Sequence, residues 1–61
     1  MEKEISYNEI EKAMNEIIEC ANIAKSECKK EKPDLVVLCD YAFENIEKLL
    51  ERVERCILSL D

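Results

Sequence analysis

The chain has 61 residues, enough for one small domain, in which a single hydrophobic core is only marginally large. It has no His, which removes the most versatile acid–base group near neutral pH and the commonest metal ligand. Its net charge of −6, from 15 acidic and 9 basic residues, disfavours direct binding to nucleic acid, which requires clustered Lys and Arg. Helix-favouring residues dominate and Gly is absent, so we expect an all-α fold.

The first predicted helix extends from about residue 7 to residue 30. Ser6 and Glu9 have the spacing of a capping box, which is typical of a helix N-terminus. Small and apolar residues then recur at alternating spacings of four and three, which is a heptad seam. The seam of this helix consists of Ile10, Met14, Ile17, Ala21, Ala24 and Cys28.

A short loop at about residues 31–33 precedes the second predicted helix, at about residues 34–60. Pro33 disfavours helical geometry at the residue before it and suits the first turn of a helix. Asp34 fits that N-terminus as a cap or first-turn residue. The same four-three spacing then continues without a break to the end of the chain. This second seam consists of Leu35, Cys39, Ala42, Ile46, Leu49, Val53, Cys56 and Leu60.

The stretch "LVVLCDYAF" at residues 35–43 could also be a buried strand, but nothing else in the chain would pair with it. The heptad seam passes through it in register, which favours helix. We therefore expect residues 1–61 to form one domain, an antiparallel hairpin of two helices.

The apolar arc on each predicted helix covers roughly 160°, which is wider than a two-helix seam requires. A second row on the second helix adds to this width, namely Val36, Phe43, Leu50 and Ile57. We therefore expect two hairpins to associate into a four-helix bundle. Residues 25–32 carry 4 basic and 2 acidic residues, whereas residues 1–19 carry 6 acidic and 2 basic. Antiparallel hairpins would place these opposite charges together, so the predicted assembly is an antiparallel homodimer.

Four cysteines, Cys20, Cys28, Cys39 and Cys56, allow several interpretations. In the predicted hairpin no two of them are level, which argues against an intrachain disulfide. Their spacing lacks the close pairs of a zinc site, although a Cu(I) site lined by thiols in a bundle core stays conceivable. The favoured interpretation is that all four are free thiols, packed as small hydrophobic residues in a reducing compartment.

Three apolar residues lie off the seams near the loop. Val37 and Tyr41 are predicted to point almost opposite to the core, and Ile23 is similarly misplaced on the first helix. Single exposed apolar residues are ordinary, but together these three form a candidate patch for a protein partner.

The leading functional hypothesis is a non-enzymatic protein–protein interaction module, a small homodimeric regulator, adaptor or inhibitor. One alternative is an acidic mimic of nucleic acid that occupies a DNA- or RNA-binding protein, and a second is the Cu(I)-binding bundle. We expect no catalytic residues, cofactor or resident metal. The N-terminal residues have no apolar core, and no apolar run approaches the length of a membrane span, so we expect a cytoplasmic protein without a signal peptide.

Overall fold

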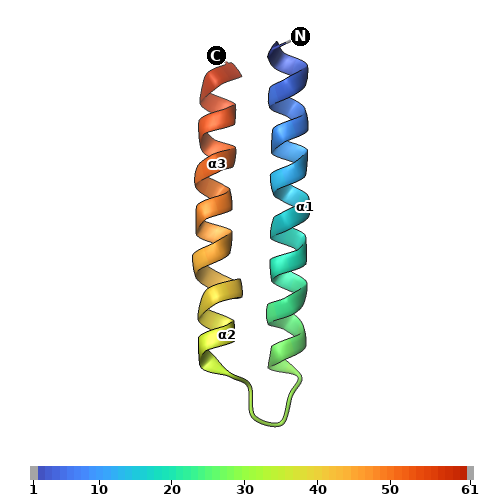
Figure 1. Ribbon diagram of the computed structural model, residues 1–61, viewed down its shortest axis with the longest axis vertical. Coiled ribbons are helices and arrows are strands. Elements are labelled where there is room, and N and C mark those ends of the chain that lie inside the picture. Colours follow the sequence, from blue (N-terminus) through green and yellow to red (C-terminus); the bar gives the residue numbers. More distant parts are fainter. Residues whose placement is uncertain (1, 61) are drawn as a thin grey trace.

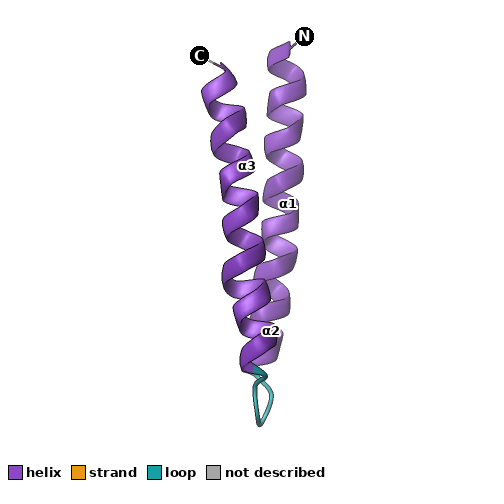
Figure 2. Ribbon diagram, turned by 60° about the vertical axis from the view of Figure 1, so that its left-hand side comes forward, coloured by secondary structure: helices purple, strands orange, loops and turns teal. Residues whose placement is uncertain are grey.

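The computed structural model describes the backbone of residues 2–60 and the side chains of residues 7–60. Helix α1 (Glu2–Cys28) is followed by a loop and then by α2 (Leu35–Cys39), a π-helix η1 (Asp40–Glu44) and α3 (Asn45–Leu60), which continue one another in a single rod. The two rods lie antiparallel, with both ends of the chain on the side opposite the loop (Figure 1). A view turned by 60° shows the same side-by-side arrangement (Figure 2). The predicted all-α hairpin is confirmed, and residues 2–60 contain no strand.

Helix α1 begins at Glu2, five residues before the predicted start, so Ser6 lies within the helix and the predicted N-terminus there is wrong. The physical reason is that Glu, Lys and Glu at residues 2–4 favour helix, and acidic residues suit a first turn. The helix ends at Cys28, two residues early. Two hydrogen bonds of a turn follow. The amide of Lys29 donates to the carbonyl oxygen of Ser26 at 3.2 Å, and the amide of Lys30 donates to that of Glu27 at 3.1 Å.

The start of α2 is fixed by Asp34. This residue is extended (φ −82°, ψ 115°), and its Oδ1 accepts a hydrogen bond from the amide of Val36 at 2.9 Å. The side chain thereby satisfies one of the amides that have no partner within the helix. The capping role predicted for Asp34 is confirmed, and the loop covers residues 29–34.

The face of α1 that packs against the second rod overlaps only in part with the predicted seam. Every second residue of the packed face lies one position earlier in the chain than the predicted seam residue. Its most buried side chain is Ala13, which is 1% exposed, with Ala24 also buried. Ile10, Ile17 and Cys20 are half-buried, and the first two were predicted. Three residues of the predicted seam do not pack within the single chain and are exposed: Met14, Ala21 and Cys28.

The π-helix η1 is the cause of the corresponding shift on the second rod. The amide of Asn45 donates to the carbonyl of Asp40, five residues back, so the turn holds an additional residue and the seam slips by one position. After η1 the predicted seam residues are buried or half-buried, namely Ile46, Leu49, Val53, Cys56 and Leu60. Before and within η1 the half-buried apolar residues are instead Val37, Leu38 and Tyr41. The seam predicted for the bundle core is therefore interrupted within the single chain, where Leu35, Cys39 and Ala42 are exposed.

The hydrophobic core of the single chain is thin. Ala13, Leu49 and Val53 form its one buried cluster, with Ile10, Ile17 and Cys20 packed against it. Among the described side chains, no large one is fully buried. Two rods alone leave most of their apolar surface in water, because each can cover only a narrow stripe of the other.

Candidate functional site

The ion pair between Glu16 and Arg52 identifies one side of the hairpin. Arg52 Nη1 lies 3.5 Å from Glu16 Oε2, across the two rods. Each of these residues immediately precedes a seam residue, Ile17 or Val53. One residue turns a helix by about 100°, so the residue after a seam residue lies on the opposite side of the hairpin from the residue before it. Met14, which follows Ala13, and Leu50, which follows Leu49, therefore lie on the side opposite the ion pair.

This opposite side carries an exposed row of apolar residues along the length of the hairpin, which we call the apolar face. Helix α1 contributes residues at a spacing of seven, and the second rod contributes both the displaced seam residues and the predicted second row. Its members are Tyr7, Met14, Ala21 and Cys28 from α1, and Leu35, Cys39, Ala42, Phe43, Leu50 and Ile57 from the second rod. Val36, the first residue of that second row, is also exposed. The six seam residues that do not pack within the chain therefore all lie on the apolar face.

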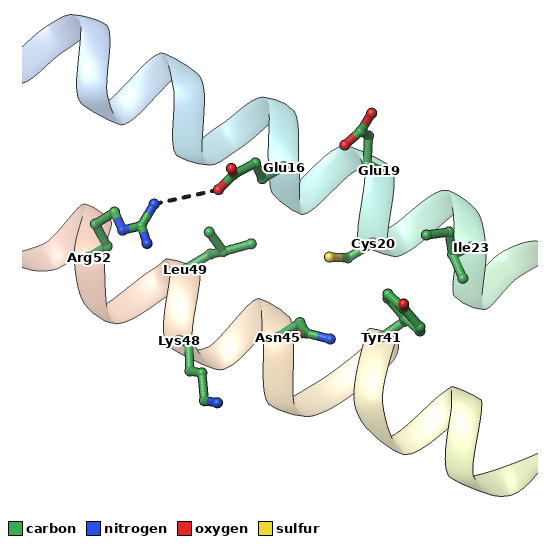
Figure 3. A pocket seen from close by; sticks show the side chains of 9 residues that line it. All are labelled: Glu16, Glu19, Cys20, Ile23, Tyr41, Asn45, Lys48, Leu49 and Arg52. Carbon is green, nitrogen blue, oxygen red and sulfur yellow. Dashed lines mark hydrogen bonds and ion pairs between the residues drawn. The ribbon is translucent and has the colours of Figure 1, made fainter.

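A groove occupies the side marked by the ion pair (Figure 3). It has a volume of about 410 Å³, and its apolar lining consists of Cys20, Ile23, Tyr41 and Leu49. In Figure 3 the Tyr41 ring points from the second rod toward α1, between Cys20 and Ile23. Asn45 adds a neutral polar group to the same rod. The groove thus has an apolar floor with polar edges.

The charged edges of this groove differ in sign. The α1 edge carries Glu16 and Glu19, and the α3 edge carries Lys48 and Arg52. In Figure 3 Glu19 and Lys48 point outward from the two rods, whereas Glu16 and Arg52 approach each other. Since both members of the pair are half-exposed, the pair contributes little to stability. The Glu16–Arg52 pair can therefore separate with only a small loss of free energy.

Two of the three residues in the predicted partner patch line this groove together. Ile23 is exposed and Tyr41 is half-buried, and both belong to its lining. Val37 is half-buried and lies outside that lining. The prediction that Val37 and Tyr41 point away from the core is wrong, because η1 turns them toward α1. Sequence reasoning missed the π-helix, and with it the groove that Asn45, Lys48 and Arg52 line together with Tyr41.

Glu27 ties the loop to the end of α1. Its side chain is buried, at 6% exposed, and its Oε2 accepts a hydrogen bond from the Asp34 amide at 2.9 Å. Its Oε1 lies 2.9 Å from Lys30 Nζ. The hydrogen bond from Lys30 and then that from the Asp34 amide lower the pKa of Glu27, and these effects outweigh the partial burial, which raises it.

We expect the hairpin to lose stability as the pH falls through the lowered pKa of Glu27. A folded-state pKa below the ordinary value of 4.5 means that this stabilisation is complete above the unfolded-state pKa and disappears as the folded carboxylate takes up a proton. Urea unfolding followed by circular dichroism, from about pH 6 to about pH 2, measures the loss. Glu27→Gln keeps an acceptor for Asp34 but removes the charge, so its stability should fall less steeply with acid. Glu31→Gln, an exposed neighbour, is the control, and equal slopes in both variants would contradict the assignment.

The four cysteines are free thiols in the structure, as expected. Cys20 and Cys56 are half-buried, which fits their predicted packing role, whereas Cys28 and Cys39 are exposed. Within the described part of the chain, no three Cys, Asp or Glu side chains are grouped so that they could hold a metal ion.

Comparisons with known proteins returned no matching family model, no matching curated protein and no matching solved structure. Among the described residues, no helix combines the length and the apolar character needed to cross a membrane.

Proposed function

We propose that the chain is a non-enzymatic protein–protein interaction module that works as a homodimer joined through the apolar face. One observation carries this proposal: large apolar residues lie exposed in a row while the core of the single chain stays thin. Leu35, Phe43, Leu50 and Ile57 are each at least half exposed, whereas the buried apolar residues are Ala13, Ala24, Leu49 and Val53. Chains of this size usually need a second source of stability, and a partner that covers this row provides one.

A second copy fits this requirement because two such faces are self-complementary. Packing the apolar faces together makes a four-helix bundle whose centre contains Met14, Leu50 and Ile57 from both copies. The basic loop end of one copy then lies beside the acidic open end of the other if the hairpins are antiparallel. Exposed Lys25, Lys29, Lys30 and Lys32 at the loop end, and exposed Glu9, Glu11 and Glu54 toward the open end, supply this complementarity.

Sedimentation equilibrium of the reduced protein tests the proposal. We expect a dimer at micromolar concentration, with helical content that falls on dilution because folding and association are linked. A folded monomer throughout this range, with undiminished helical content, would rule the homodimer out.

The native cysteines report the orientation of the two copies. Cys28 and Cys39 both lie near the loop end of the apolar face, so a parallel dimer brings the four exposed thiols together. An antiparallel dimer separates the two loop ends by most of the 48 Å length of the hairpin. We expect a short bis-maleimide to give no covalent dimer with a Cys56→Ser chain, which lacks the native thiol of the open end. We expect a covalent dimer when Tyr7→Cys is added to that chain, because it places a thiol at the open end opposite Cys28 of the second copy. A covalent dimer of the Cys56→Ser chain itself would indicate the parallel arrangement instead.

A further inference from the structure

We infer that the groove lined by Cys20, Ile23, Tyr41 and Leu49 is a second, independent binding site, which takes one amphipathic helix of a partner protein. That helix places apolar side chains on the floor, basic side chains along the α1 edge and acidic side chains along the α3 edge. The site lies on the side opposite the apolar face, so it stays open when two copies associate. It does not depend on the homodimer proposed above.

The π-helix is the first observation that supports this site. An unbroken α-helix would continue the heptad and direct Leu35, Cys39 and Ala42 at α1, as the sequence pattern favours. The structure instead holds a π-turn at Asp40–Glu44, which directs Tyr41 into the groove. Such turns occur frequently at functional sites, and places where a strong local pattern is broken are often sites of function. The break here delivers the one aromatic residue of the groove.

The shape and charge of the groove identify the occupant. Two antiparallel rods form a channel along their length, and a third helix can lie in such a channel with its apolar stripe on the floor. The volume of about 410 Å³ accommodates an anchoring side chain or two between Tyr41 and the Glu16–Arg52 pair. Because one edge is acidic and the other basic, a helix with both edges of one sign would meet like charge on one side.

Three synthetic helical peptides with the same leucine stripe test this inference. One carries Lys along one edge and Glu along the other, the second carries Glu along both edges, and the third carries Lys along both. We expect the mixed peptide to bind at least about tenfold more tightly than either uniform peptide, because only it satisfies both edges. One of its two directions in the groove pairs the Lys edge with α1 and the Glu edge with α3, since reversing the helix exchanges its edges. Fluorescence anisotropy of labelled peptides gives the dissociation constants.

Matched variants locate the binding. Ile23→Glu changes the groove, and Leu58→Glu makes a similar change at an exposed residue outside both proposed surfaces. We expect Ile23→Glu to weaken binding of the mixed peptide by about tenfold or more, and Leu58→Glu to leave its dissociation constant within about twofold. Helical content by circular dichroism confirms that both variants fold. The inference is overturned if no peptide binds, if the three bind equally, or if both variants weaken binding alike. None of these outcomes bears on the sedimentation result for the homodimer.

Discussion

Ile57→Glu is expected to convert the dimer into a monomer, whereas Leu58→Glu is expected to leave it intact. The two residues are adjacent on α3 and similarly exposed in the single chain, at 52% and 62%. One residue of helix turns them about 100° apart, so Ile57 lies on the apolar face and Leu58 outside it. Burial of an isoleucine side chain contributes about 1.5 to 3 kcal/mol. Ile57 is already about half covered within the single chain, so two copies together lose roughly 1.5 to 3 kcal/mol of burial, and placing two carboxylates in the interface raises the loss to at least about 3 kcal/mol.

This loss corresponds to an increase in the dissociation constant of at least about a hundredfold. Sedimentation equilibrium at several concentrations measures it directly. Because the monomer has a thin core, we also expect Ile57→Glu to lower the helical signal in circular dichroism at concentrations where Leu58→Glu retains it. Equal dissociation constants for the two variants would show that the apolar face is not the interface.

Leu49→Ala is expected to produce the largest loss of stability of any single truncation in the core. Leu49 is 9% exposed and packs with Ala13 and Val53, the buried cluster between the rods. Truncating a buried leucine to alanine costs about 2 to 5 kcal/mol, which is a large part of the stability of a small domain. For a domain of this size the melting temperature should fall by at least about 8 °C.

Leu58→Ala is the matched control, because Leu58 is exposed and lies outside both proposed surfaces. Its effect should stay within about 0.5 kcal/mol. Thermal unfolding at one fixed protein concentration measures both variants, since a linked dimer makes the melting temperature depend on concentration. Similar losses for Leu49→Ala and Leu58→Ala would contradict the seam described for α3.

The position of Tyr41 is the clearest case of a feature that the sequence pattern misplaces. The heptad at Leu35, Cys39 and Ala42 is regular, and a helix of uniform pitch would bury these residues and expose Tyr41. A π-turn leaves the type of each residue unchanged and alters only which face it occupies. No composition or spacing rule in the chain marks the turn, so the groove could not be assembled before the structure placed Tyr41 beside Cys20 and Ile23.

The sequence by itself determined the all-α hairpin, the cap at Asp34 and the packing of α3 from Ile46 to Leu60. Helix propensity, a capping side chain and apolar periodicity act over a few residues, and nothing distant overrides them in those segments. Only the tertiary structure decided which of two adjacent residues meets the other rod, Ala13 or Met14 on α1 and Tyr41 or Ala42 on the second rod. Each helix carries an apolar arc wider than one partner can cover, so the pattern permits several rotations of each rod. The burial of the small Ala13 side chain between the rods and the extra residue in η1 select one of these rotations.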